Sequence, residues 1–185
     1  MRGYGTPDVR IVGMVGYAPV TKLAQRDESL AAFTYELVAP RTLTQRKEQL
    51  NLTALAPSAV VATTLYSVIS PGTEIAAWVG KPALRPGKIY PRVLGYCNVA
   101  RVHAFGSQVA DLTIGDIILT HQCHRSAFYC EQNDILLTLP SSTTIAAQQR
   151  LAASYLYHLG YMALLDGGFR PGYEVAVVGF GALGF

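Results

Sequence analysis

The sequence predicts an α+β fold, in which a β-rich domain is followed by a long helix and the first strand of an α/β sheet. Up to Pro140, short runs rich in β-branched and aromatic residues alternate with turn residues. This spacing is typical of a small barrel or sandwich. After Pro140 the apolar residues recur with a helical period. The apolar run Val175–Val178 is short, β-branched and followed by glycine, as in buried parallel strands.

Composition restricts the kind of protein. The chain has 185 residues, of which 50% are hydrophobic and 15% charged, so it can form a core and is not disordered. The net charge of +3 comes from scattered basic residues, and we expect no nucleic-acid partner. Three cysteines are too few for a disulfide framework. No secretory leader or membrane span is apparent, so we expect a cytoplasmic protein that does not bind membranes.

The expected strands are separated by turn residues such as Pro71-Gly72 and Ile114-Gly115. They occupy the ranges Phe33–Val38, Ala59–Ile69, Asn98–Phe105, Asp116–Thr120, Ser126–Cys130 and Ile135–Leu139. A further short strand is possible at Val9–Val15, in the least informative part of the chain.

The helical part begins after Pro140. Thr144–Gln149 can be helical, and Leu151–Asp166 has an apolar face that Gly167-Gly168 terminates. Three regions follow from this division: residues 1–32 of uncertain structure, a β-rich domain at 33–140, and residues 141–185 that carry the helix and the start of the α/β sheet.

A glycine-rich turn follows the last expected strand. Gly179, Gly181 and Gly184 form the pattern G-x-G-x-x-G, which in nucleotide-binding folds allows a tight turn and close approach of a pyrophosphate to the backbone. The helix and the acidic residue that would confirm the pattern do not follow before Phe185. We therefore expect these glycines to be cofactor-binding in the parent fold, but the given chain alone not to bind NAD or NADP usefully.

Four motifs together resemble the medium-chain dehydrogenase/reductases. They are Ile69-Ser70-Pro71-Gly72-Thr73-Glu74, Val93-Leu94-Gly95-Tyr96, Ile114-Gly115-Asp116, and Pro171-Gly172 followed by Val177-Val178-Gly179 and Gly181. The resemblance covers residues 33–185 and is closest to the subgroup with the ISPGTE motif, which includes bacteriochlorophyllide dehydrogenase-like proteins. It implies a GroES-like β-barrel at 33–140 and, at 141–185, a linking helix with the start of an incomplete Rossmann domain.

The same resemblance implies a site whose residues can be checked singly. Zinc-type members have cysteine where this chain has Ser70, and histidine followed by glutamate where it has Tyr96 and Cys97. Serine and tyrosine are poor zinc ligands, so we expect no catalytic zinc. The resemblance makes Ser70, Thr73 and Tyr96 the candidate catalytic hydroxyls, with Thr73 at a position that often serves in proton relay.

Other polar residues have less specific interpretations. Glu74 would support the site or cap a following helix. The segment His121-Gln122-Cys123-His124, with Cys130, looks like a metal cluster, but its spacing does not match a four-cysteine zinc lobe. The preferred interpretation is a short connection in which His124 lines the substrate cleft.

Two classes of function follow. The resemblance implies an NAD(P)-dependent oxidoreductase that transfers hydride to or from an alcohol, carbonyl or activated alkene, without zinc and inactive as the given chain alone. The alternative is a non-catalytic GroES-like module, or truncated product, that binds a small molecule. In both cases we expect a small-molecule ligand, and self-association or homo-oligomers through the incomplete sheet.

Overall fold

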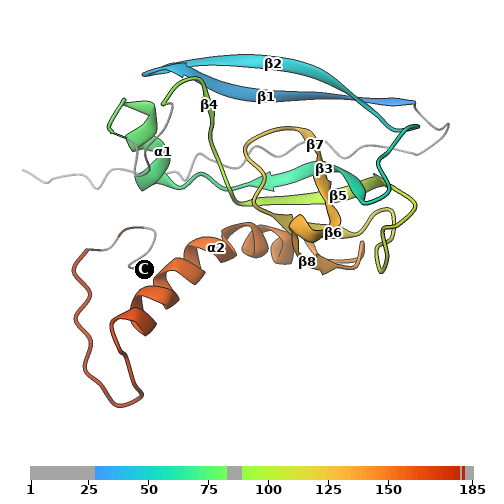
Figure 1. The fold of residues 1–185 in the computed structure, drawn as a ribbon. Helices are drawn as coiled ribbons and strands as arrows, with labels where there is room; N and C mark the ends of the chain where they lie inside the picture. Colours follow the sequence, from blue (N-terminus) through green and yellow to red (C-terminus); the bar gives the residue numbers. More distant parts are fainter. Residues whose placement is uncertain (1–27, 83–88, 180, 182–185) are drawn as a thin grey trace, which may run out of the picture.

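The computed structural model describes residues 28–82, 89–179 and 181. These residues form two antiparallel sheets and two α-helices (Figure 1), so the predicted α+β class is confirmed. A three-stranded sheet has the order β2-β1-β4, and a five-stranded sheet has the order β7-β3-β5-β6-β8. An isolated bridge between Thr34 and Arg125 links β1 to the segment before β7, but the two sheets do not close into the barrel that the sequence predicts.

The strands are β1 (Ser29–Ala39), β2 (Thr42–Asn51), β3 (Ala59–Ser67), β4 (Arg92–Val93), β5 (Asn98–Phe105), β6 (Ile117–Thr120), β7 (Ala127–Glu131) and β8 (Ile135–Leu139). The helices are α1 (Pro71–Trp78) and α2 (Ile145–Asp166), with a 3-10 turn at Gln132–Asp134. Six of the strands lie where the sequence places them. The expected strand at Val9–Val15 lies outside the described residues.

Strand β2 is the main element that the sequence did not predict. Its first six residues are all exposed, so no alternation of buried and exposed positions marks it. It forms because β1 supplies a full antiparallel edge, with Leu30 opposite Leu50, and because Arg41 adopts a positive φ of 58° in the connecting turn. Pairing with a neighbour, rather than local pattern, determines this strand.

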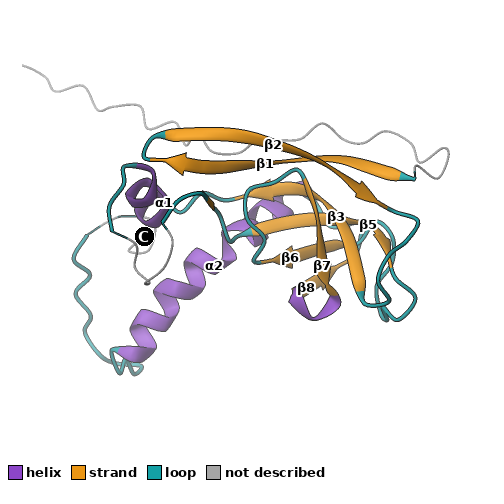
Figure 2. Cartoon of the chain, turned by 45° about the horizontal axis from the view of Figure 1, so that its top comes forward, coloured by secondary structure: helices purple, strands orange, loops and turns teal. Residues whose placement is uncertain are grey.

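The molecule has three layers (Figures 1 and 2). The β1–β2 hairpin lies over one face of the five-stranded sheet, and α2 runs along the other side. Ala32 and Leu50 of the hairpin pack on Val61 and Ala127 of the sheet. Ala152 of α2 is fully buried against Val99, Ile117 and Leu119.

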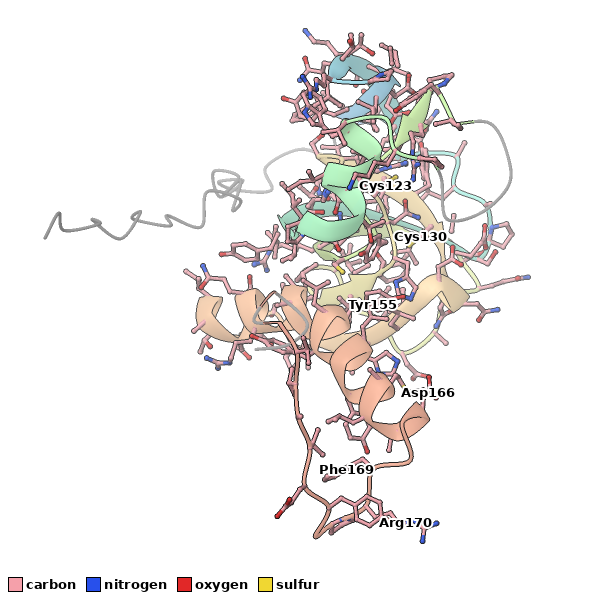
Figure 3. All side chains as sticks on the ribbon, turned by 90° about the vertical axis from the view of Figure 1, so that its left-hand side faces the viewer. Cys123, Cys130, Tyr155, Asp166, Phe169 and Arg170 are labelled. Carbon is pink, nitrogen blue, oxygen red and sulfur yellow. The ribbon has the colours of Figure 1, made fainter. Side chains whose placement is uncertain are left out.

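Helix α2 changes environment along its length. Gln148, Ala152 and Leu156 in its first half are buried, whereas Tyr157, Tyr161 and Leu165 are exposed. Figure 3 shows its end at Asp166, with Phe169 and Arg170, extending away from the sheets. Among the described residues, neither helix combines the length and the apolar character needed to cross a bilayer.

The prediction of a strand at Val175–Val178 is wrong in this structure. Residues 173–179 are described but carry no strand, and the side chain of Val178 is fully exposed. A strand needs a hydrogen-bonded neighbour, and none of the described residues pairs with this run. Gly179 does adopt a positive φ of 103°, a conformation that side chains disfavour.

Candidate functional site

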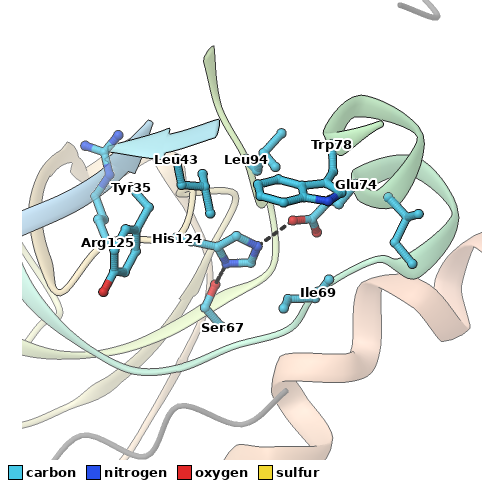
Figure 4. A pocket seen from close by; sticks show the side chains of 10 residues that line it. Tyr35, Leu43, Ser67, Ile69, Glu74, Trp78, Leu94, His124 and Arg125 are labelled. Atoms are coloured by element: carbon cyan, nitrogen blue, oxygen red, sulfur yellow. Dashed lines mark hydrogen bonds and ion pairs between the residues drawn. The ribbon is translucent and has the colours of Figure 1, made fainter. Parts of the chain in front are cut away.

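An open pocket lies between the β1–β2 hairpin, the end of β3, helix α1 and the loop before β7 (Figure 4). Its volume is about 310 Å³. Most of its wall is apolar, and its polar groups gather around one histidine. The lining residues are Tyr35, Leu43, Ser67, Ile69, Glu74, Ile75, Trp78, Leu94, His124 and Arg125.

The polar part of the pocket is a chain of two short hydrogen bonds centred on His124. Its Nδ1 lies 2.6 Å from Ser67 Oγ, and its Nε2 lies 2.6 Å from Glu74 Oε2. Glu74 is buried, whereas His124 retains 20% of its side-chain exposure. A hydroxyl, an imidazole and a carboxylate are thus connected in a row, an arrangement that can pass a proton.

The backbone holds His124 in place from two directions. Its own N–H donates to the carbonyl of Leu94 at 2.8 Å. Its ring lies directly over Gly95, where an added Cβ would come within 2.7 Å of ring atoms. Gly95 also has a φ of +95°. The glycine of the motif Val93-Leu94-Gly95-Tyr96 therefore makes room for the imidazole.

Helix α1 positions the carboxylate. Pro71 at the first helical position and Glu74 in the first turn are both favourable at a helix start. The Oε1 atom of Glu74 accepts the backbone N–H of Ser70 at 2.7 Å, and its Oε2 faces His124. Both interpretations of Glu74 from sequence, a helix-start residue and a supporting residue of the site, agree with this geometry.

Cys97 lies beneath the site. Its carbonyl accepts a hydrogen bond from Ser67 Oγ at 3.2 Å, and its side chain is buried. Burial, with the nearby charge of Glu74 as a smaller cause, raises the pKa of the Cys97 thiol to about 12. This cysteine is therefore a neutral thiol at physiological pH and acts as a small packing residue.

Arg125 occupies the rim beside Tyr35. Its Nη2 lies 2.7 Å from Cys123 Sγ, and its Nε is buried without a hydrogen-bond partner among the described residues. The guanidinium places a fixed positive charge at the pocket.

The three hydroxyl residues proposed from the family resemblance lie near this pocket but do not line it. Ser70 is buried at the N-cap of α1, and Thr73 is exposed on the same helix. Tyr96 is half-buried, and its ring meets Tyr155 of α2 edge to face at 5.2 Å. His121 joins this second cluster, with its ring 5.1 Å from that of Tyr155.

Two further candidates were a glycine turn and a metal cluster. Of the three motif glycines, Gly179 and Gly181 are described and Gly184 lies outside the described residues. Cys130 is packed in the hydrophobic core, whereas His124 faces the pocket. Within the described residues no three histidine, cysteine or acidic side chains stand close enough to hold a metal ion.

Sequence reasoning missed Ser67 and Trp78. Ser67 lies within the predicted strand Ala59–Ile69, where it resembles any polar strand residue, and Trp78 lies in a helix that the sequence indicates only through one interpretation of Glu74. The partner of Ser67 is 57 residues away, so no local signal marks it.

No family model and no curated protein matches the sequence. Solved structures do match its fold. CAD from Helicobacter pylori, in complex with NADP(H), matches 84% of this chain with a TM-score of 0.63 and 15% identity. A mutant enoyl thioester reductase from Candida tropicalis matches 74% with a TM-score of 0.58 and 20% identity. Alcohol dehydrogenase TADH from Thermus sp. ATN1 matches 76% with a TM-score of 0.54 and 18% identity.

At these identities the likeness establishes the fold. The resemblance to medium-chain dehydrogenase/reductases is therefore confirmed at the level of the overall fold: the chain folds like part of these proteins, although its barrel is not closed and Val175–Val178 forms no strand. It spans about half of their length, with 54%, 44% and 49% of the three structures covered.

Proposed function

We propose that this chain provides the substrate-binding part of an NAD(P)-dependent oxidoreductase of the medium-chain class. The observation that carries the proposal is the apolar pocket with the Ser67–His124–Glu74 chain of hydrogen bonds, on a fold shared with such enzymes. A nicotinamide cofactor supplies the hydride chemistry, and the protein supplies binding and polarisation. An apolar wall with a few polar groups is the usual composition of a small-molecule site.

The cofactor-binding glycines and the catalytic hydroxyls predicted from the sequence have the following proposed roles. Gly179, Gly181 and Gly184 would approach the pyrophosphate of NAD or NADP, because glycine lets the phosphate contact the backbone. The positive φ of Gly179 suits such a turn. The hydroxyls of Ser70, Thr73 and Tyr96 lie outside the pocket lining, and we propose that they serve the reacting oxygen, in place of a metal, for a substrate that extends beyond the pocket. Of these, Tyr96 has its ring fixed by Tyr155, and Tyr96→Phe would show whether its hydroxyl is used.

The proposed enzyme works without zinc. Ser70 and Tyr96 stand where zinc-type members have thiolate and imidazole ligands, and neither suits zinc at neutral pH. We expect the purified protein to hold less than about one zinc in ten chains after dialysis, by elemental analysis. One zinc per chain that survives dialysis would contradict this.

Cofactor binding tests the oxidoreductase proposal without knowledge of the substrate. The natural gene product that carries residues 1–185 is titrated with NADH and with NADPH, and nicotinamide fluorescence is followed. We expect a Kd of about 100 μM or tighter for one of the two. Binding of neither cofactor would overturn the proposal.

A second candidate is a binding module without redox turnover. The pocket favours it, because every lining residue lies between positions 35 and 125 and none belongs to the nucleotide-binding region. If pocket ligands bind and neither cofactor does, this second function is the correct one.

A further inference from the structure

Arg125 carries a positive charge that its described neighbours do not neutralise. Its Nη2 lies 2.7 Å from Cys123 Sγ, a weak hydrogen-bond acceptor, and its buried Nε has no partner among the described residues. No ion pair between described residues includes Arg125. The guanidinium therefore presents its charge and unused N–H donors at the wall of the pocket.

The carboxylate of the pocket is already engaged. Glu74 Oε1 accepts the backbone N–H of Ser70 at 2.7 Å, and Oε2 lies 2.6 Å from His124 Nε2. Glu74 is only 5% exposed, so its carboxylate faces these partners. Among the described lining residues, Glu74 is the one acid and Arg125 is the one permanently charged base. The charge that remains for a ligand is thus positive.

The two ends of the pocket differ in polarity. Figure 4 shows Arg125 and Tyr35 at one end, Trp78 and Ile69 at the other, and His124 between them. The volume of about 310 Å³ is near the lower limit of the usual range for small-molecule sites. A ligand that fills this pocket needs a compact apolar body and a hydrogen-bond acceptor at one end.

We propose that the pocket binds a small apolar carboxylic acid as its anion, with the carboxylate at Arg125 and the apolar part against Ile69 and Trp78. A carboxylate matches the planar guanidinium because its two oxygens accept two parallel N–H donors. The anion also offsets the cost of holding a half-buried cation without a counter-charge. This inference rests on the proposed use of the pocket as a small-molecule site, and it adds the chemical class of the ligand.

Ligands of other charge fit the same site less well. A cation at this end would be repelled by the guanidinium. A neutral ligand of the same shape would fill the apolar part, but its hydrogen bond to Arg125 would be about half as strong as that of an anion. A polyphosphate needs more basic groups than the described lining residues offer, because Arg125 is the one arginine or lysine among them.

The sole tryptophan of the chain, Trp78, lines the pocket and reports on its occupancy. Its fluorescence in the 185-residue chain is followed during titration with 4-phenylbutanoate and with 4-phenylbutanamide, which share an apolar body and differ in charge. Both titrations are done at about pH 7.5, where the acid is ionised and His124 is in the same state for both probes. We expect the anion to bind about tenfold more tightly at low salt.

Salt and substitutions at arginine assign this preference. About 1 M salt should reduce it, because ions screen the charge. Arg125→Gln removes the charge, so the two probes should bind within about twofold of each other. Arg125→Lys keeps the charge without the planar fork and should retain a preference of about threefold. Arg150→Gln, at an exposed arginine of α2, removes the same charge elsewhere and should keep the full preference.

Circular dichroism checks that each variant is folded. If Arg125→Gln does not fold, the salt dependence and Arg125→Lys decide the outcome. Equal affinities of the two probes for the unchanged chain, a preference that persists in folded Arg125→Gln, or a preference that Arg150→Gln also abolishes would each overturn the inference. No binding of either probe at about 10 mM would overturn it together with the use of the pocket as a ligand site.

This experiment is separable from the test of the proposed function, because it uses no nicotinamide. A tenfold preference for the anion that depends on Arg125 supports the ligand class even if the cofactor titration fails. Conversely, cofactor binding by the natural gene product, together with equal affinities for the two probes, would leave the oxidoreductase proposal standing and remove only the carboxylate.

Discussion

At the scale of single residues, the site depends on the close contact between the backbone of Gly95 and the imidazole ring of His124. His124 lies against Gly95 at a distance that no side chain at position 95 would permit. The same close packing directs Nδ1 at Ser67 and Nε2 at Glu74. Position 95 of the Val93–Tyr96 motif therefore requires glycine because the imidazole of His124 occupies the space of a side chain, and not only because the backbone turns there.

Gly95→Ala should destabilise the protein and disrupt the site. The new Cβ would meet the imidazole at 2.7 Å and would hold a φ of +95° that L-residues avoid. We expect a loss of about 1–3 kcal/mol in the free energy of unfolding, measured with urea. Gly72→Ala in α1, where an added Cβ has nothing within 4 Å, is the control and should be neutral or slightly stabilising. Equal effects at the two glycines would contradict the close contact.

The buried cysteines should make stability fall at high pH. Burial is the main cause that raises the pKa of both Cys97 and Cys130 from 9.0 to about 12. Between these values the unfolded thiols have lost their protons and the folded ones have not, so the free energy of unfolding decreases as pH rises above 9.0. Urea unfolding at about pH 8 and about pH 10 measures the decrease.

The cysteine prediction has its own control. A chain with Cys97→Ala and Cys130→Ala should show a smaller decrease between the same two pH values, because the thiols no longer contribute. If the decrease is as large in this chain as in the unchanged one, groups other than the thiols cause it.

At the scale of elements, capping and tertiary pairing determine which segments form. Helix α2 begins at a side-chain cap: Thr144 Oγ1 accepts the N–H of Ala147 at 3.3 Å. The sequence indicates Ser141 or Ser142 as the cap and helical structure from Thr144, whereas the structure places the cap at Thr144 itself. For α1 the sequence gives two conflicting indications: Pro71-Gly72 indicates a break after the strand, whereas Glu74 and a proline at the first helical position favour a helix start.

Thr144→Ala should cost about 1 kcal/mol of stability, because an N–H at the helix start loses its acceptor. Urea unfolding followed by circular dichroism measures the change. Thr113→Ala, an exposed threonine in the loop before β6, is the matched control. A loss of equal size at Thr113 would show that the cap itself contributes nothing.

At the scale of the whole molecule, the first half of α2 completes the core and the second half is uncovered. Removing α2 would uncover Val99, Ile117 and Leu119, which Ala152 now covers. Beyond Leu156 the apolar side chains of the helix and the following segment face solvent, among them Tyr161, Leu165 and Val178. Uncovered apolar surface of this kind favours association.

We therefore expect the 185-residue chain to self-associate, and a chain that ends at Leu139 to associate more strongly because its sheet loses the cover of α2. Analytical ultracentrifugation of both at matched concentrations measures this. Tyr161→Glu in the full chain should weaken association by placing a charge in the exposed face. A full chain that is monomeric, or a Leu139-terminated chain that associates less, would show this account to be wrong.

The sequence by itself determined the fold class, six of the strands and the long helix. These features arise from local pattern: alternating or β-branched runs, turn residues between them, and a helical period ended by glycine. The motifs also directed attention to the right region, since Glu74 and Gly95 belong to two of them and His124 was expected in a cleft.

Only the tertiary structure decided which side chains meet. Ser67, Glu74 and His124 lie on three different elements, and their contact depends on strand pairing and on the room above Gly95. Strand β2 forms because β1 pairs with it, and Val175–Val178 forms no strand because none of the described residues pairs with it. Local pattern encodes the propensity of a segment, whereas hydrogen-bonded neighbours and packed surfaces, which lie far apart in the chain, decide whether the segment becomes an element or a site.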